Sequence, residues 1–331
     1  MAAAIIILGP GLPSLGDFRF RSGVYNWLMH IRSLSQSFRL LAKCILSAAL
    51  LPAAYSQTIE SHTAEIDGVK LHYLTVGHGA PLVLLHGYAE TSLMWRPIMP
   101  LLAERFTVIA PDLPGIGDSA IPAQGLDMKT AAIRMHALAK SLGVEKARVV
   151  GHDIGLMVAY AYAAQFPAEV EKLVVMDAFL PGVGGWEPVY NDPGLWHFRF
   201  NGPTPEKLVE GRERIFFEHF WNDFAADRTR SIPEADRKAY TTAYARPGRM
   251  RAGWAYFVSF QQAAKDFAEL AQTKLTMPVL VIGGEKALGV VLGQQMKLVA
   301  SDVTVVILKD TGHWVMEERP KETAAALAKF L

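Results

Sequence analysis

Residues 149–155, Val-Val-Gly-His-Asp-Ile-Gly, join a strand pattern to a helix pattern. The apolar strand pattern covers residues 147–150, and the run from Leu156 to Ala164 reads as a helix that stops at Pro167. Glycines two positions before and after a central residue are typical of a tight elbow that lifts that side chain, here Asp153, above a sheet. An aspartate in this place is also an ordinary helix N-cap, so the rest of the chain must decide between a catalytic and a structural role.

The composition of the chain excludes several classes of protein. With 331 residues, 51% of them hydrophobic, the chain can bury a large core. A net charge of +1 gives no electrostatic footprint for nucleic acid or an anionic membrane, so neither is expected as a partner. Cys44 is the single cysteine, which excludes a disulfide within the chain and makes a cysteine-based zinc site implausible.

The N-terminal stretch has the pattern of a secretory signal. Basic residues within Arg32–Lys43 precede an apolar run at 44–51, and Ala54-Tyr55-Ser56 supplies a small-X-small cleavage site. The apolar run is too short for a stable membrane span. We therefore expect residues 1–56 to be an N-terminal extension and signal peptide that starts at Met29, and the mature protein to be periplasmic or secreted. A membrane-anchored or disordered tail is the alternative.

Strand and helix patterns alternate along the rest of the chain. Residues 63–73 read as a hairpin around Asp67-Gly68, because apolar residues alternate on both sides of a two-residue turn. Further strands are expected at 81–85, 107–110, 170–176, 278–282 and 303–308, and helices at 95–106, 128–142, 292–299 and 323–331. This order predicts an α/β fold: a mostly parallel eight-stranded sheet with helices on both faces.

An aromatic-rich segment interrupts this alternation between residues 181 and 271. It has little strand pattern, and helices are expected from Pro205 and from Pro233, since proline suits the first turn of a helix. We interpret it as an inserted helical cap. The core then comprises residues 57–180 and 272–331.

Acids and a histidine occur where strands of the predicted sheet end. Asp177 directly follows the strand at 170–176, and His313 lies in Asp-Thr-Gly-His-Trp shortly after the last strand. Active groups of open α/β sheets gather at the carboxyl ends of strands, and the order nucleophile, acid, histidine is the one expected here. Glu285, in Gly-Gly-Glu after the next strand, is the alternative to Asp177 as the acid that orients the histidine.

The strand at 81–85 ends in His86-Gly87-Tyr88, where an oxyanion loop is expected. In such a loop His86 and Gly87 would support the backbone, and the N–H groups of Tyr88 and Ile154 would stabilise an oxyanion. The chain has no His-Glu-X-X-His, phosphate loop or Gly-X-Gly-X-X-Gly motif, so no metal or other cofactor is expected.

Together with the elbow, His86-Gly87, Asp112–Gly117 and Gly312-His313-Trp314 resemble the epoxide hydrolase and haloalkane dehalogenase branch of the α/β-hydrolases. The resemblance runs from about Thr63 to the C-terminus. Residues 152–155, 195–198, 217–220 and 244–247 are similar to secreted bacterial epoxide hydrolases of this branch. Some relatives dimerise through the cap, so a homodimer is possible.

The resemblance implies an α/β-hydrolase fold and a role for each site residue. Asp153 would be the nucleophile, His313 the general base and Asp177 the charge-relay acid. His197 takes the place of the first ring-opening tyrosine of the family. The second ring-opening tyrosine aligns with Phe257, which has no hydroxyl.

Two tyrosines close to Phe257 in sequence are candidates for the missing donor. Tyr256 is adjacent, and Tyr244 is nearby in sequence. Either hydroxyl could act as a second donor if it reached the pocket.

The leading interpretation is a hydrolase that opens small apolar epoxides with water, without a cofactor. A haloalkane or haloacid dehalogenase is the first alternative, because it uses the same Asp153 and His313 but releases a halide. The second alternative is a non-catalytic secreted binding protein on the same fold.

Overall fold

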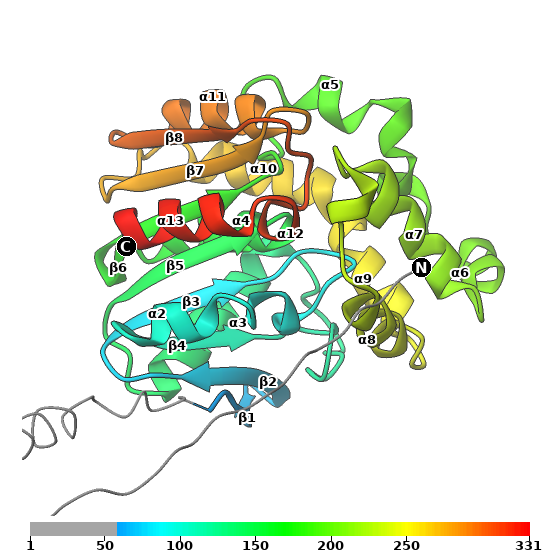
Figure 1. The fold of residues 1–331 in the computed structure, drawn as a ribbon, viewed down its shortest axis with the longest axis horizontal. Helices are drawn as coiled ribbons and strands as arrows, with labels where there is room; N and C mark the ends of the chain where they lie inside the picture. Colours follow the sequence, from blue (N-terminus) through cyan, green and yellow to red (C-terminus); the bar gives the residue numbers. More distant parts are fainter. Residues whose placement is uncertain (1–57) are drawn as a thin grey trace, which may run out of the picture. The chain divides into compact units, whose positions relative to one another are not determined.

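Eight strands form one sheet in the order β1-β2-β4-β3-β5-β6-β7-β8 (Figure 1) in a computed structural model, which describes residues 58–331. The strands are β1 Glu60–Ile66, β2 Val69–Val76, β3 Ala80–Leu85, β4 Phe106–Pro111, β5 Ala147–His152, β6 Val170–Met176, β7 Val279–Gly284 and β8 Val303–Leu308. The β1–β2 and β2–β4 pairs are antiparallel and the other five are parallel. The predicted α/β fold with a mostly parallel eight-stranded sheet is confirmed.

The predicted two-residue hairpin turn joins β1 to β2 at the edge of the sheet. Asp67 and Gly68 have φ values of 50° and 71°. A turn with two positive φ values matches the right-handed twist of the strands that it connects, and Asp-Gly is a favoured pair for it. The position of this strand pair therefore follows from its local sequence.

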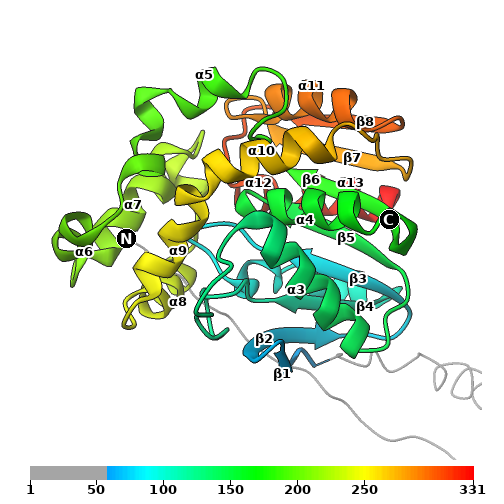
Figure 2. The ribbon, with the colours of Figure 1, turned by 180° about the vertical axis from the view of Figure 1, so that it is seen from behind.

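Helices cover both faces of the sheet (Figures 1 and 2). One face carries α3 Met128–Ser141, α4 Ile154–Gln165, α10 Phe260–Leu270 and α11 Gly289–Val299; the other carries α2 Met99–Ala103, α12 Val315–Glu318 and α13 Pro320–Phe330. Every residue of α4 from Ile154 to Ala163 is buried. The elbow therefore connects a buried strand to a buried helix, which gives Asp153 a rigid support.

The prediction of one helix over residues 95–106 is wrong about the length of the helix. A short 3-10 turn covers Ser92–Trp95, α2 covers only Met99–Ala103, and Phe106 already begins β4. Pro97 and Pro100 explain the difference, since proline lacks the N–H that an α-helix needs beyond its first turn.

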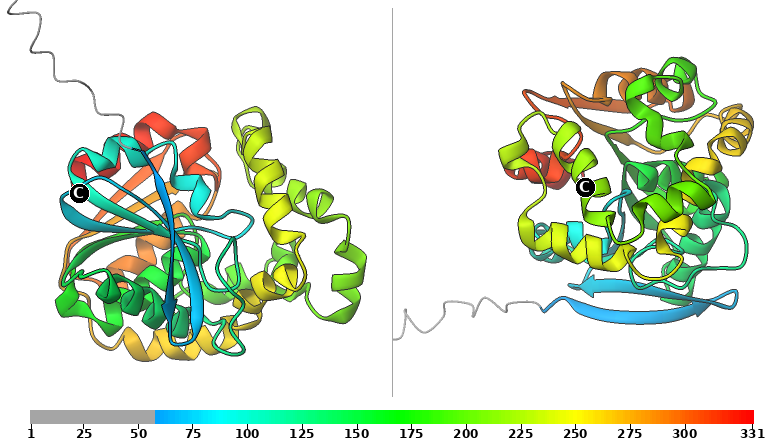
Figure 3. Two further views of the ribbon diagram at one scale, coloured as in Figure 1. Left: turned by 90° about the horizontal axis from the view of Figure 1, so that it is seen from below. Right: turned by 90° about the vertical axis from the view of Figure 1, so that its right-hand side faces the viewer.

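Between β6 and β7 the chain forms the helical insert that the sequence predicts. It contains α5 Trp186–Tyr190, a 3-10 segment at Pro193–Arg199, α6 Pro203–Val209, α7 Glu213–Asp223, α8 Glu234–Tyr244 and α9 Arg249–Val258. These helices lie beside one end of the sheet (Figure 3), whereas the following α10 packs against α3 and α4. The cap boundaries at residues 181 and 271 stay a prediction.

The predicted signal peptide and its start at Met29 lie outside the described residues, so export and the leader remain predictions. Within residues 58–331, no helix is both long enough and apolar enough to cross a membrane.

Candidate active site

Asp153 stands at the turn between β5 and α4 in an unusual backbone conformation, with φ 51° and ψ −125°. A positive φ is uncommon for a residue with a side chain and costs about 1–3 kcal/mol. The two flanking glycines are required by space: a Cβ on Gly151 would lie 2.2 Å from the carbonyl oxygen of Gly155, and one on Gly155 would lie 2.4 Å from that of Leu85. The elbow motif is therefore a steric requirement of this strand–helix junction.

One carboxylate oxygen of Asp153 is held by the loop after β3. The backbone N–H of Tyr88 donates a 2.8 Å hydrogen bond to Oδ2 of Asp153. Ile154, whose N–H is the other expected oxyanion donor, is the first residue of α4. Helix N-termini favour negative charge, so the start of α4 suits an anion on this carboxyl group.

The loop that carries Tyr88 is fixed by His86. Its Nδ1 donates to the carbonyl oxygen of Gly87 at 2.8 Å, and its Nε2 accepts from the N–H of Leu113 at 2.9 Å. Burial lowers the pKa of His86, which keeps the ring neutral as this pair of bonds requires. A Cβ on Gly87 would lie 2.9 Å from Cβ of Asp153, so glycine is needed for the close approach.

His313 and Asp177 meet from separate strand ends. Nδ1 of His313 lies 2.9 Å from Oδ2 of Asp177, and Oδ1 of Asp177 accepts the N–H of Gly284 at 3.0 Å. Asp177 is fully buried, and its φ of 39° turns the side chain at the end of β6. Glu285 is exposed and accepts the N–H of Asp310, so the structure brings Asp177 and not Glu285 to His313.

A buried ion pair behind the elbow was not anticipated from the sequence. Nδ1 of His152 lies 3.1 Å from Oε2 of Glu90, and Nε2 lies 3.0 Å from the carbonyl oxygen of His313. Because both ring nitrogens face acceptors, both carry protons. Burial by itself lowers the pKa of His152, but Glu90 and then Asp153 raise it to about 9. No local pattern connects two residues 62 positions apart, so only the fold could reveal the pair.

A cavity of about 550 Å³ lies above Asp153, Asp177 and His313, between the sheet and the insert. Six phenylalanines line it: Phe179, Phe198, Phe220, Phe224, Phe257 and Phe260. Such a volume and lining suit a small apolar molecule.

His197 reaches this cavity from the 3-10 segment of the insert. It is 4% exposed, and its ring centroid lies 4.8 Å from that of Phe220 and 5.2 Å from that of Phe257. Burial, together with the positive potentials of His219 and His313, lowers the pKa of His197 to about 3. At neutral pH His197 is therefore a neutral imidazole with one N–H to donate.

Neither candidate tyrosine hydroxyl reaches the cavity. Tyr256 donates to the carbonyl oxygen of Pro114 at 2.9 Å, and Tyr244 donates to that of Glu90 at 3.2 Å. Both side chains are buried, and neither lines the cavity, whereas Phe257 does. The expectation that one of them could serve as a second donor is not supported by their positions.

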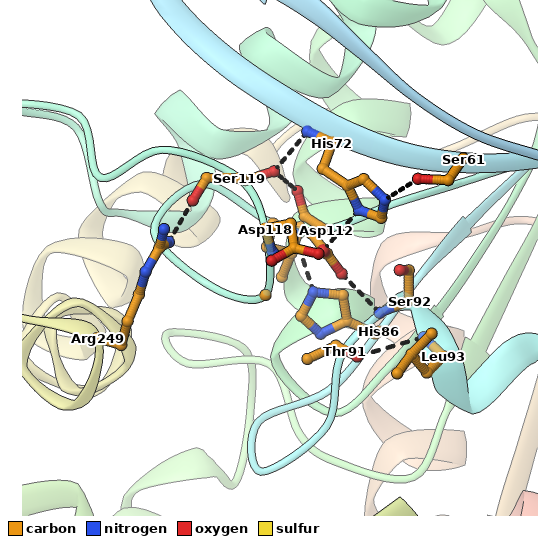
Figure 4. Close-up of polar contacts among 12 residues, drawn as sticks. Ser61, His72, His86, Thr91, Ser92, Leu93, Asp112, Asp118, Ser119 and Arg249 are labelled. Atoms are coloured by element: carbon orange, nitrogen blue, oxygen red, sulfur yellow. Dashed lines mark hydrogen bonds and ion pairs between the residues drawn. The ribbon is translucent and has the colours of Figure 1, made fainter. Parts of the chain in front are cut away.

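His72, Asp112 and Asp118 form the one group in the described part of the chain that brings three metal-ligating side chains close together. Their atoms already have partners (Figure 4): Nδ1 of His72 bonds Oδ2 of Asp112 at 2.7 Å, and Nε2 bonds Ser61. Asp112 also accepts the N–H of Ser92 and of Asp118. This group thus braces the loop before Leu113, which in turn bonds His86.

The model of the alpha/beta hydrolase fold family matches residues 80–320 of the chain. The chain belongs to this family. It is 34% identical over 282 residues to a soluble epoxide hydrolase of Corynebacterium sp. (strain C12), an alignment that covers 83% of this chain and 98% of the relative.

Two further similarities bear on the choice of reaction. The crystal structure of the Cif epoxide hydrolase from Acinetobacter nosocomialis aligns with a TM-score of 0.77 and 28% identity, covering 88% of this chain and 95% of that one. A fluoroacetate dehalogenase of Burkholderia sp. is 26% identical over 291 residues, with 82% and 93% covered. The protein is therefore an enzyme of the epoxide hydrolase branch, and the non-catalytic alternative is disfavoured.

Proposed function

We propose that the protein hydrolyses small apolar epoxides to vicinal diols through an ester on Asp153. The observation that carries this proposal is that the elbow presents a carboxylate, with Oδ2 held by the N–H of Tyr88, where acyl-transfer enzymes of this fold present a hydroxyl. An ionised carboxylate needs no base to attack a saturated carbon.

In the first step Oδ1 of Asp153 attacks a ring carbon. The new C–O bond forms as the ring C–O bond breaks, and the electron pair of the broken bond goes to the ring oxygen. The resulting alkoxide accepts the N–H of His197 and takes a proton from water. The product of this step is an alkyl ester of Asp153.

In the second step His313, oriented by Asp177, removes a proton from water, and the oxygen of that water attacks the ester carbonyl carbon. Tyr88 and Ile154 offer backbone N–H groups to the oxyanion of the tetrahedral intermediate. Collapse of this intermediate releases the diol, which takes the proton from His313. Ionisation of the regenerated Asp153 returns the proton consumed in the first step, so the sum is epoxide plus water giving diol.

Dehalogenation is the second candidate, because Phe257 offers no donor and halide leaves without needing a proton. The similarity to a fluoroacetate dehalogenase is compatible with it. The same Asp153 and His313 would act, and only the leaving group would differ.

The two candidates are distinguished by trapping the ester. In His313→Gln the first step proceeds and the second is blocked, so intact mass should increase by the mass of the epoxide after incubation with styrene oxide or 1,2-epoxyhexane. The unsubstituted protein should form the diol. Adding Asp153→Asn to His313→Gln should abolish the adduct.

An adduct formed from 1-bromobutane or fluoroacetate, and from neither epoxide, would reassign the protein as a dehalogenase. Absence of any adduct in all four incubations and with the activated epoxide 3,3,3-trifluoro-1,2-epoxypropane, with the variant folded by circular dichroism, would refute covalent catalysis by Asp153.

A further inference from the structure

The side chains around the cavity offer very few donors to a leaving oxygen. The four aspartates that line it, Asp153, Asp177, Asp192 and Asp223, are acceptors when ionised. Nδ1 of His313 is bonded to Asp177, and its other nitrogen must remain free to act as a base.

The remaining polar side chains of the lining either bond to other groups or present no polar atom to the cavity. Trp314 donates its Nε1–H to the carbonyl oxygen of Phe220 at 3.1 Å. Lys286 is 55% exposed and lies 3.3 Å from Asp310. Tyr88 contributes its ring to the lining, but its hydroxyl oxygen is buried away from open space. Among the residues that the structure describes, His197 is thus the side-chain donor available inside the cavity.

The proton of His197 belongs on Nε2. Its Nδ1 is buried without a hydrogen-bond partner among residues 58–331. A proton on this nitrogen would be a buried donor without an acceptor, which costs free energy, whereas Nε2 of the same ring is not among the buried unpartnered atoms. With Nδ1 bare, Nε2 carries the single proton of the neutral ring.

Phe257 occupies the place beside His197 where a second donor would stand. Its ring centroid lies 5.2 Å from that of His197 and 4.6 Å from that of Tyr88, whose N–H holds Asp153. It is 3% exposed, and its ring plane is steeply inclined to both neighbouring rings, by 75° to His197 and 70° to Tyr88. A ring without a hydroxyl therefore lines the cavity beside His197.

The presence of one side-chain donor, His197, affects how the rate of ring opening depends on the basicity of the leaving oxygen. A well-placed donor to a developing oxyanion is worth about 10²–10³ in rate. With one donor in place of two, more of the negative charge must be carried by the oxygen itself in the transition state. The rate then depends more steeply on how well the substituents of the epoxide withdraw that charge.

We propose that Phe257 restricts this enzyme to epoxides whose leaving oxygen is made less basic by an electron-withdrawing substituent on the adjacent carbon. The inference rests on the proposed function and concerns its first step, in which Asp153 forms a bond to the unsubstituted ring carbon. The electron pair of the breaking bond then goes to the oxygen beside the substituent. Alkyl-substituted epoxides of the same size are poor substrates.

The test measures ring opening alone. In the His313→Gln protein, the rate of ester formation is followed by intact mass with 3,3,3-trifluoro-1,2-epoxypropane and 3-methyl-1,2-epoxybutane, which have similar volumes. Each rate is divided by the rate at which free acetate opens the same epoxide in water. This ratio removes the intrinsic reactivity of each compound.

The expected normalised preference for the trifluoromethyl epoxide is at least about tenfold. In the same His313→Gln background, Phe257→Tyr should accelerate ester formation from 3-methyl-1,2-epoxybutane by about 10- to 100-fold. The ratio of the two normalised rates should then fall toward 1. Phe260→Tyr is the matched control, since it adds a hydroxyl to the same cavity lining at a ring that packs against Phe257 and is not one of the aromatic partners of His197. It should leave the ratio of the two substrates unchanged.

Equal normalised rates for the two epoxides in the protein with Phe257 would overturn the inference while leaving the proposed function intact. The inference would also be overturned if Phe257→Tyr and Phe260→Tyr changed the ratio of the two normalised rates equally. Failure of every protein to form an adduct with any epoxide would instead remove the proposed function, and this inference with it. The comparison of the two substrates needs no cap variant, so it holds even if Phe257→Tyr does not fold.

Discussion

The floor of the cavity and its roof hold their functional groups differently. On the floor, Asp153 is fixed by the N–H of Tyr88, and Asp177 is fixed by Gly284 and His313. In the roof, His197 is surrounded by phenylalanine rings, and its Nδ1 has no partner among the described residues.

This difference follows from the elements that supply the residues. Neighbouring strand ends of one sheet bring backbone N–H groups beside carboxylates, so polar groups can fix each other. Helices of the insert meet through side chains, and here those are mostly aromatic. We therefore expect substitutions on the floor to impair chemistry for every substrate, and substitutions in the roof to alter the dependence on substrate.

The largest effect is expected for Asp177→Asn. The amide cannot hold His313 in the tautomer that accepts a proton from water, and a comparable change in a serine protease triad lowers kcat about 10⁴-fold. Diol formation should fall to that extent while ester on Asp153 accumulates in intact mass. Glu285→Gln, which alters an exposed carboxylate that does not contact His313, should stay within about twofold of the unsubstituted protein.

Equal losses in Asp177→Asn and Glu285→Gln would break the distinction between the two strand-end acids. Loss of ester formation in Asp177→Asn would show that its role is not confined to the second step.

An intermediate effect is expected for His197→Phe. Removing the single donor of the roof should slow ester formation by about 10²–10³ and leave ester hydrolysis unchanged, because the second step uses floor residues. Single-turnover measurements with styrene oxide separate the two steps. His197→Gln, which keeps an N–H donor, should recover part of the loss; a defect in hydrolysis in place of ring opening would contradict this assignment.

The smallest effect is expected on stability and comes from the buried ion pair between Glu90 and His152. The folded-state pKa of His152, about 9, lies above the ordinary value of 6.5, so the folded protein binds this proton more tightly. The contribution of the Glu90–His152 pair to the free energy of unfolding is complete below about pH 6.5 and is lost as the pH rises through 9. The shift corresponds to roughly 3 kcal/mol of unfolding free energy.

Denaturant unfolding between pH 6.5 and 9.5 measures this loss. His152→Gln should be less stable at pH 6.5 and show a flatter decline with pH. His72, whose pKa is also raised by Asp112 against the effect of burial, should contribute a smaller decline of the same sign in both proteins. Parallel pH curves for the two proteins would rule out a charged His152.

Much of the fold could be predicted because its determinants are local. Apolar runs specify the buried strands, the Asp67-Gly68 pair specifies the hairpin turn, and Gly151 and Gly155 permit the elbow around Asp153. The helix predicted at residues 95–106 is shorter in the structure, because Pro97 and Pro100 cannot both lie inside one continuous helix.

The candidate site was less predictable, because which residues meet in it depends on contacts between segments far apart in the sequence. Asp177 and Glu285 both follow strands, and only the turn of Asp177 toward Gly284 and His313 distinguishes them. The Glu90–His152 pair joins residues 62 positions apart without any sequence pattern.

By itself, the sequence determined the order of strands and helices, the elbow, and a carboxylate in place of a hydroxyl at its tip, since these depend on hydrophobic periodicity and on glycines at fixed spacing. The tertiary structure alone decided that the hydroxyls of Tyr244 and Tyr256 bond to backbone carbonyls outside the cavity while Phe257 faces it. The physical reason is that the direction of a side chain in the insert depends on how its helices rotate against the core, and that rotation is set by packing across the whole interface.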